Sequence, residues 1–380
     1  MICVHIRHNF ARNQENRLMQ KIKLLLAFFI LASTSLFAQD EIEVVNIENP
    51  AVQAYMADST YYNNSDFRVS VISKYYNKEL YGPDLDRPQG KNVKWTPTTG
   101  AENISEVRIT VSESKDYSSP FIHNPSSKSA DSYEIKNCIP GRVYYYKVEE
   151  FLKDGSVTEV ANGVFRTVGQ VRMIQVLNAH NVRDIGGWMT LYGAPVKYGR
   201  LYRSGSLDAI KPAGRQDFAV NLNVGAELDL RSESRLKKSK LGDDKDLLVL
   251  AHSDYMSGVK RKNHLYVKDL SWIVARLREG KNVDWHCAIG CDRCGTLSFL
   301  IEGLLGLNEI DLGRDYELST LSKFKRLRRS VKEMINYIKT FGGEGDNLAQ
   351  CFYNYWLSIG ASREDMDYLL EVMLDYPEKK

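Results

Sequence analysis

The sequence lacks an excess of charge of either sign, which removes several kinds of partner. It carries 51 Lys and Arg against 48 Asp and Glu, a formal net charge of +3 over 380 residues. The first 38 residues hold five of the basic and one of the acidic residues, so the rest keeps 46 basic and 47 acidic residues, a net charge of −1. Because a chain so balanced has no basic surplus, we predict no nucleic-acid partner.

Long apolar runs and cysteines are also few. The one extended apolar stretch, Leu24 to Phe37, has 14 residues and is interrupted by Ser and Thr, whereas a membrane-spanning helix needs about 18–20. Cysteine occurs six times, and five copies follow residue 38. An odd number argues against a disulfide scaffold. We therefore expect neither stable membrane insertion nor a disulfide framework.

Residues 1–38 have the pattern of a signal peptide. A basic start, Lys21 and Lys23, precedes the apolar stretch, and small residues up to Ala38 end it. This order is typical of secretory leaders. The residues before Met19 are polar and fit no leader, so Met19 could be the true start. We predict that the mature chain is exported to the periplasm or the extracellular space.

Residues 40–168 alternate apolar with polar side chains. The alternation predicts strands at 92–97, 106–111, 133–148 (two strands around a turn) and 163–167. Their order resembles a fibronectin type III β-sandwich, in which Trp95 would fill the core and Tyr144 would close a tyrosine corner. The resemblance implies an all-β domain over residues 40–168, with residues 40–85 as an N-terminal extension. Such sandwiches are usually spacers or adhesion modules.

From residue 172 the pattern changes to mixed strands and helices. Strands are expected at 199–203, 225–230, 247–251 and 282–285, and helices at 269–279, 297–305, 315–341 and 350–373. The predicted fold of this part is α/β, a central sheet flanked by helices. Such folds place ligand sites at the carboxyl ends of their strands, which is where the residues after 285 fall.

Residues 286–296, His-Cys-Ala-Ile-Gly-Cys-Asp-Arg-Cys-Gly-Thr, carry the most specific signal. Cys287 and Arg293 lie six positions apart around Gly290, between a strand and a helix. Such a loop gathers main-chain amides at the positive end of the helix dipole and suits a tetrahedral oxyanion. The same groups would stabilise the Cys287 thiolate as a nucleophile, and Arg293 could bind two phosphate oxygens. The pattern predicts a cysteine-dependent phosphatase without metal or other cofactor.

The loop also has the Cys-x5-Arg spacing of the protein tyrosine phosphatase superfamily. Further segments resemble, in family order, the bacterial tyrosine/serine protein phosphatases that also act on lipid phosphates: 181–187, 199–205, 227–234, 314–319 and 355–366. The resemblance implies a tyrosine phosphatase-like catalytic domain over residues 172–380. It also implies a phosphorylated substrate, either a phosphotyrosine-type group or a small phosphomonoester.

Carried over residue by residue, the resemblance gives each loop residue a role. Cys287 would be the nucleophile that forms a phosphocysteine, Arg293 the phosphate ligand and Asp292 the general acid. Asp254 is a rival proton donor on a separate loop. His286 either orients the loop from behind or is an ordinary buried histidine. The phosphate-binding residues would be Ala288, Ile289, Gly290, Cys291, Asp292 and Arg293. Four charged residues are expected to brace loops instead: Arg183, Asp184, Asp229 and Arg231.

Two positions depart from the family pattern. Cys291 stands where a lysine that contacts extra phosphates on an inositol ring is usual, which lowers the expectation of phosphoinositide hydrolysis. Cys294 stands where a Ser or Thr hydroxyl helps the nucleophile leave, and Thr296 is not expected to replace it, so turnover could be slow. An inositol- or sugar-phosphate phosphatase and a catalytically weak phospho-ligand binding protein therefore remain as alternatives.

A metal or iron–sulfur site is a further interpretation of the crowded cysteines Cys287, Cys291 and Cys294. No fourth ligand other than His286 is near in the sequence, and Arg293 inside the run opposes a cation. We therefore predict a site without metal.

Overall fold

The computed structural model describes residues 42–60, 71–125, 127–234, 236–252, 254–323 and 331–376. The predicted signal peptide and its alternative start at Met19 lie outside these residues. Val44–Lys380 forms one compact unit. Within the described ranges, no helix has both the length and the apolar character that a membrane span requires.

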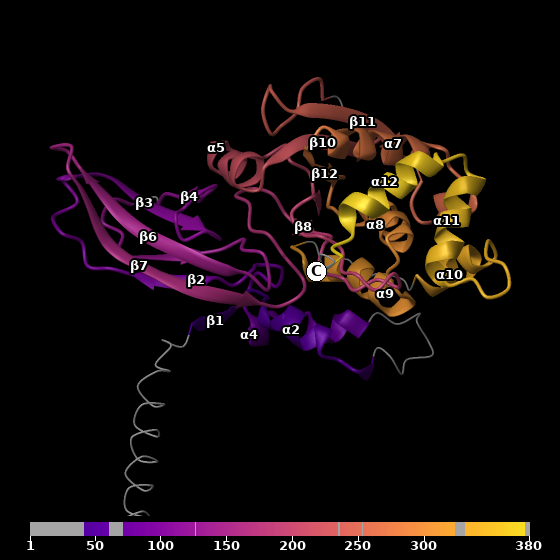
Figure 1. Ribbon diagram of the computed structural model, residues 1–380, viewed down its shortest axis with the longest axis horizontal. Coiled ribbons are helices and arrows are strands. Elements are labelled where there is room, and N and C mark those ends of the chain that lie inside the picture. Colours follow the sequence, from indigo (N-terminus) through magenta and orange to yellow (C-terminus); the bar gives the residue numbers. More distant parts are fainter. Residues whose placement is uncertain are drawn as a thin grey trace, which may run out of the picture. The chain divides into compact units, whose positions relative to one another are not determined.

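The first half of the chain forms two sheets around one apolar core. The larger has the order β1-β7-β6-β3-β4, and the smaller pairs β2 with β5. The strands are β1 (Glu43–Asn46), β2 (Lys91–Lys94), β3 (Ile104–Ser112), β4 (Phe121–His123), β5 (Ser132–Ile135), β6 (Val143–Leu152) and β7 (Val157–Val168). Figure 1 shows β3, β6 and β7 as long adjacent ribbons. Side chains from both sheets, such as Val93, Ile109 and Val148, share the core, as alternation along strands requires.

Tyr144 and Trp95 occupy this core as the sequence predicts. The exposed fraction of Tyr144 is 1% and that of Trp95 is 7%. The main-chain N–H of Ile139 donates to the Tyr144 hydroxyl at 2.9 Å, and the Tyr144 ring stacks on Phe165 with 5.6 Å between ring centroids. A buried tyrosine that binds the backbone just upstream ties the start of β6 to the preceding turn.

The second half contains a mostly parallel sheet with the order β11-β10-β12-β9-β8. Its strands are β8 (Arg183–Asp184), β9 (Leu201–Ser204), β10 (Val224–Arg231), β11 (Asp246–His252) and β12 (Asn282–His286). β10 pairs in parallel with β11 and β12, and β12 with β9. The four strands expected from the sequence are all present. The central strand β12 is buried along its whole length, including its polar residues Asn282, Asp284 and His286.

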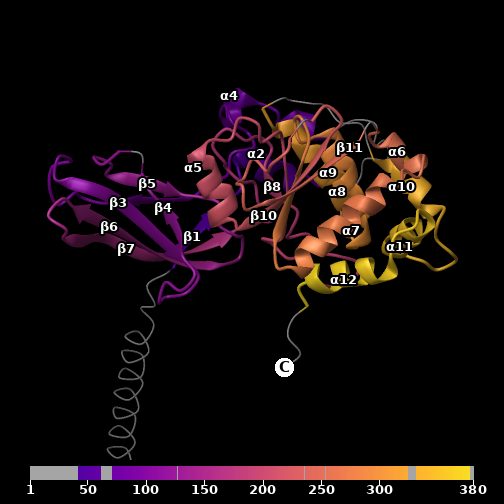
Figure 2. The same cartoon turned by 90° about the horizontal axis from the view of Figure 1, so that it is seen from above.

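Helices accompany this sheet, and the mixed α/β class agrees with the prediction (Figures 1 and 2). They are α5 (Pro212–Arg215), η2 (Gln216–Asn221), α6 (Ser257–Lys260), α7 (Leu265–Arg278), α8 (Asp292–Leu304), α9 (Glu309–Leu318), η3 (Ser319–Leu321), α10 (Lys332–Lys339), α11 (Leu348–Ser358) and α12 (Arg363–Met373). The expected single helix over 350–373 is two helices. Gly360 ends the first with φ +95°, and the Ser362 side chain caps the second.

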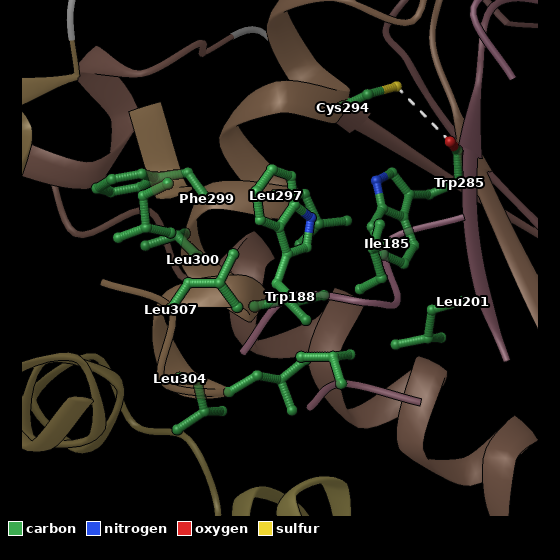
Figure 3. Close-up of a cluster of buried hydrophobic side chains, with 14 of the residues drawn as sticks. Ile185, Trp188, Leu201, Trp285, Cys294, Leu297, Phe299, Leu300, Leu304 and Leu307 are labelled. Carbon is green, nitrogen blue, oxygen red and sulfur yellow. Dashed lines mark hydrogen bonds between the residues drawn. The ribbon is translucent and has the colours of Figure 1, made fainter. Parts of the chain in front are cut away.

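Helix α8 packs at the centre of this half of the molecule. Every residue from Cys294 to Leu304 is buried, and Figure 3 shows Leu297 and Leu300 of α8 among Trp188, Trp285 and other apolar side chains. A helix that is apolar on all sides must be enclosed on all sides. The strand and the helix that flank residues 287–291 are thus both fixed by the core.

Residues between β1 and β2 also join this second core. α2 (Pro50–Met56), η1 (Val71–Tyr75) and α4 (Lys78–Tyr81) precede β2. The apolar residues Ala51, Val52, Tyr55, Val71, Ile72 and Leu85 are buried in the same cluster as Trp285 and Leu297. From the sequence, residues 40–85 were expected only as an extension of the β domain.

Candidate active site

The loop from Cys287 to Cys291 joins the end of β12 to the start of α8. Gly290 has φ +70°, a conformation that L-residues with a Cβ rarely adopt. A Cβ at this position would lie 2.7 Å from the main-chain carbon of Ser204 and 2.8 Å from the Asn181 side chain. Only glycine therefore lets the loop close against its neighbours. Because α8 begins at Asp292, directly after the loop, the loop lies at the positive end of the helix dipole, which favours a bound anion.

Neighbouring groups hold the loop by its carbonyl oxygens. The amide of Ser206 donates to Ala288 O at 3.2 Å, and Asn181 Nδ2 donates to Ile289 O at 3.1 Å. Arg203 Nη2 donates to Gly290 O at 3.0 Å. Because the N–H of each peptide points opposite to its C=O, carbonyls held from outside turn the loop amides inward. The held carbonyls thus aim the loop amides toward one centre.

Cys287 lies at that centre, with 3% of its surface exposed. Its pKa falls from the usual 9.0 to about 5. The largest cause is a hydrogen bond from the Cys294 thiol; burial opposes the shift, and the amides of Cys294 and Ile289 and the charge of Arg293 reinforce it. The thiolate is therefore the main form at neutral pH, which is the nucleophilic form.

The Cys294 thiol lies near main-chain carbonyls of β9 and β12 as well as near the nucleophile. Its Sγ lies 3.5 Å from Ser204 O and 3.7 Å from Trp285 O, the latter drawn in Figure 3. Burial and the adjacent thiolate raise the pKa of Cys294 well above its usual range. It stays protonated and can act as a donor. The Thr296 hydroxyl instead donates to Asp292 O at 2.9 Å, as expected for a residue that does not replace the missing hydroxyl.

Arg293 extends from the first turn of α8 beside the loop. Its Nη1 lies 3.3 Å from both Leu230 O and a carboxylate oxygen of Glu233. The guanidinium carbon lies 5.9 Å from the ring centroid of Tyr255. The exposed fraction of its side chain is 12%, so the arginine is ordered by its partners yet open at one edge to a ligand.

A buried cluster of charges supports the loop from behind. Asp315 on α9 binds Arg183 Nε at 3.1 Å and Arg203 Nη1 at 3.0 Å, and all three side chains are at most 1% exposed. Burial raises the pKa of Glu302, which lies in the same cluster, well above its usual range, so Glu302 stays neutral. Two guanidinium groups against one carboxylate leave a net positive charge behind the loop, which favours a bound anion.

His286 is held from the side of the sheet. Its Nε2 lies 2.9 Å from Glu227 on β10, and its Nδ1 lies 3.8 Å from Asp229. Burial alone would lower the pKa of His286, but Glu227, Asp229 and Asp284 raise it. The histidine is fully buried, and its contacts with Glu227 and Asp229 run to the neighbouring strand β10.

The other predicted bracing residues contact structural partners. Asp184 binds Arg172 at 2.9 Å and accepts from the amide of Gly199 at 2.7 Å. Asp229 and Arg231 bind each other at 2.8 Å. The roles of Asn181 and Arg203 in holding the loop were missed, although both lie in segments that the family resemblance singled out. Long-range contacts of this kind have no signal in residue spacing.

One candidate acid lies within the sequence signature and the other precedes it on a separate loop. Asp292 is the first residue of α8, directly beside Arg293. Asp254 follows β11 and forms an ion pair with Arg261, with Asn263 Nδ2 3.4 Å from the same carboxylate. Tyr255, the residue after Asp254, contacts Arg293. The loop that carries Asp254 therefore reaches the site at Tyr255.

In the described part of the chain, no group of three or more His, Cys, Asp or Glu side chains is arranged to hold a metal ion. The cysteines described there are all buried and form no disulfide with one another: Cys138, Cys287, Cys291, Cys294 and Cys351. Of the three crowded cysteines, Cys287 lies at the centre of the loop. Cys291 and Cys294 instead contact main-chain carbonyls of the neighbouring elements.

A thiolate in an amide-lined loop beside an arginine is the site of a phosphoric monoester hydrolase. Comparison with protein families agrees, since residues 174–373 match the model described as "Tyrosine phosphatase family". The match covers more than half of the chain. The chain belongs to the tyrosine phosphatase family and is a phosphoric monoester hydrolase.

Two solved structures of Tk-PTP align with this chain at 18% sequence identity. The active form covers 46% of this chain and 90% of its own, with a TM-score of 0.20. A mutant form covers 46% and 89%, with a TM-score of 0.19. No curated protein matches the chain.

Proposed function

We propose that the protein hydrolyses phosphomonoesters through a phosphocysteine on Cys287. The thiolate attacks phosphorus, the bond to the leaving oxygen breaks, and water then displaces the cysteine to release phosphate. The observation that carries this proposal is the lowered pKa of Cys287, about 5, at the centre of the loop amides. A thiol with its usual pKa would be mostly protonated and a weak nucleophile at neutral pH.

Arg293 and the loop amides would bind the phosphoryl oxygens. In the free protein Arg293 is paired with Glu233, whose side chain is 56% exposed. A phosphate dianion offers oxygens that match the guanidinium fork better than one exposed carboxylate. The substrate would therefore replace Glu233 as the partner of Arg293, and the arginine would stabilise charge that develops in the transition state.

An aspartic acid would protonate the leaving oxygen and then activate water. Asp292 is the favoured candidate because it lies directly beside Arg293 at the start of α8, whereas Asp254 lies on a separate loop after β11. Proton donation needs a carboxyl group within hydrogen-bond reach of the leaving oxygen. A rotation of the loop that carries Tyr255 would be required before Asp254 could serve.

The substrate class follows from the side chain at position 291. Cys291 is fully buried, and its Sγ lies 3.5 Å from Ile289 O and 3.7 Å from Asn181 Nδ2. This position therefore supplies no cation toward extra phosphates. We propose a phosphotyrosine-type or other singly phosphorylated substrate in preference to a phosphoinositide.

The mature chain would be exported, and its first β region would be a fibronectin type III-like module, consistent with the β4-β3-β6-β7 strand order.

The test replaces the nucleophile by its closest oxygen analogue. Cys287→Ser should abolish hydrolysis of an aryl phosphate, because an alkoxide is not accessible at neutral pH, while binding of vanadate or another phosphate analogue survives. Cys351→Ser, at a buried thiol on α11, is the matched control and should keep full activity. A chelator should not change the wild-type rate.

Two results would overturn the proposal: hydrolysis that persists in Cys287→Ser, or wild-type activity that a chelator removes. The alternative, a weak phospho-ligand binding protein, is favoured by Cys294 in place of a hydroxyl. A burst of one equivalent of product without further turnover would support that alternative.

A further inference from the structure

One segment, defined here as α2 with the residues up to Thr60 and η1 (residues 50–60 and 71–75), lies outside the part of the chain that matches the family, residues 174–373. Its apolar side chains nevertheless belong to the catalytic core. Ala51, Val52, Tyr55 and Ile72 are 0% exposed, in the cluster that also contains Cys287 and Cys294. A spacer module would contribute no such residues, so this segment is built into the catalytic half of the molecule.

Two polar contacts join the segment to a single carboxylate on α9. The Tyr55 hydroxyl donates to Glu317 Oε2 at 3.2 Å, and the main-chain N–H of Ile72 donates to the same oxygen at 3.3 Å. Glu317 is 4% exposed. A buried carboxylate is costly unless such donors satisfy it. The two contacts therefore fix the position of α9 relative to the segment.

Charged side chains connect helix α9 to the phosphate-binding loop. Asp315, two residues before Glu317, accepts from Arg203 Nη1 at 3.0 Å. Arg203 then donates to Gly290 O at 3.0 Å and approaches Cys291 O at 3.4 Å. The carbonyl of Ser319, just after α9, lies 3.9 Å from Cys291 Sγ. A displacement of α9 would thus reach the loop carbonyls directly.

We propose that Tyr55 is a positioning residue for the phosphate-binding loop, acting through Glu317, α9 and Arg203. The segment of residues 50–60 and 71–75 thereby supports the catalytic unit. This proposal rests on the proposed function of Cys287, but the loop geometry can be measured without turnover. The loop amides and the Cys294 thiol keep Cys287 ionised, and that effect depends on their distances from Sγ.

The experiment uses the full chain and compares two hydroxyl deletions in the same segment. Tyr55→Phe removes the bond to Glu317 and keeps the ring in the core. Tyr75→Phe is the control, because the Tyr75 hydroxyl binds Asp58 at 2.7 Å within the segment itself. For each we measure kcat and KM on an aryl phosphate, the midpoint of thermal unfolding, and the pH dependence of Cys287 alkylation by iodoacetamide.

In Tyr55→Phe, we expect kcat/KM to fall roughly three- to tenfold, the size of one hydrogen bond to a charged acceptor that is partly transmitted to the site. The alkylation midpoint of Cys287 should move to higher pH. Tyr75→Phe should leave kcat/KM and the alkylation midpoint unchanged, even if it lowers the unfolding temperature as far as Tyr55→Phe does. A Tyr55→Phe variant that is less stable but has the wild-type kcat and alkylation midpoint would overturn the proposal.

A double-mutant cycle with Glu317→Gln tests the route. If Tyr55 acts through Glu317, the double variant should lose no more activity than Glu317→Gln alone. Additive losses would overturn the route through α9. If the wild type alkylates with a low midpoint but hydrolyses nothing, the proposed function fails. The alkylation shift in Tyr55→Phe still decides whether the segment positions the loop.

Discussion

Replacing Cys294 with alanine should raise the pKa of the Cys287 thiol by roughly one to two units. The pKa of Cys287 is about 5, against a usual value of 9.0, and the Cys294 thiol is the largest cause. The difference of about four units corresponds to about 5 kcal/mol in favour of the thiolate. One hydrogen bond to a charged acceptor contributes about 1.5–3 kcal/mol, which at 1.36 kcal/mol per unit gives the expected shift.

The assay is the rate of iodoacetamide alkylation on the Cys287 peptide as a function of pH. Because the thiolate reacts and the thiol does not, the wild-type rate should rise through pH 5 and be near its plateau at pH 7. In Cys294→Ala the rise should move to about pH 6–7. Cys294→Ser keeps a donor at the same place, so its midpoint should stay near the wild-type value.

An alanine variant that still titrates near pH 5 would refute the reasoning, since the loop amides and Arg293 would then suffice. A serine variant that shifts as far as alanine would show that the position matters through packing and not through its donor. Thermal unfolding of both variants provides the control, because Cys294 is fully buried and either change could loosen the core.

Three further outcomes follow from the same site. Asp292→Asn should slow hydrolysis of esters with poor leaving groups by roughly a hundredfold or more, and of activated phenyl esters much less; if Asp254→Asn shows that dependence instead, the acid lies on the separate loop. Peroxide should oxidise the Cys287 thiolate to a sulfenic acid, which a neighbouring thiol converts to a disulfide with loss of water, and dithiol should restore activity. Peptide mapping that finds Cys287 joined to neither Cys291 nor Cys294 would reject that role. Cys294→Thr should raise turnover if breakdown of the phosphocysteine limits the rate, and pre-steady-state kinetics would show the burst disappear.

The sequence predicts the local elements of the site well. Strand periodicity locates β12, and the helical pattern locates α8, because each is set by neighbours along the chain. The spacing of Cys287 and Arg293 then defines the loop between them. The family match over residues 174–373 confirms the class of enzyme.

What the sequence could not predict are contacts between distant residues. Arg203 and Asp315 are 112 positions apart, yet they meet behind the loop at 3.0 Å. Tyr55 reaches Glu317 across 262 positions. Neither contact leaves a periodic signal, since each depends on how the sheet and α9 pack. Cys294 lacks the hydroxyl, as the sequence shows, and its thiol is also the largest cause of the lowered pKa of Cys287, an effect that residue spacing does not reveal.

The central claim is that phosphate passes through Cys287. Rapid quenching of the wild type during hydrolysis of an aryl phosphate, followed by mass spectrometry of the peptide that contains residue 287, measures this directly. The account predicts a transient phosphoryl group on Cys287 that forms at the rate of the burst, decays at the rate of turnover, and is absent from Cys287→Ser. Full turnover with no phosphorylated peptide, or with the phosphoryl group on another residue, would contradict it.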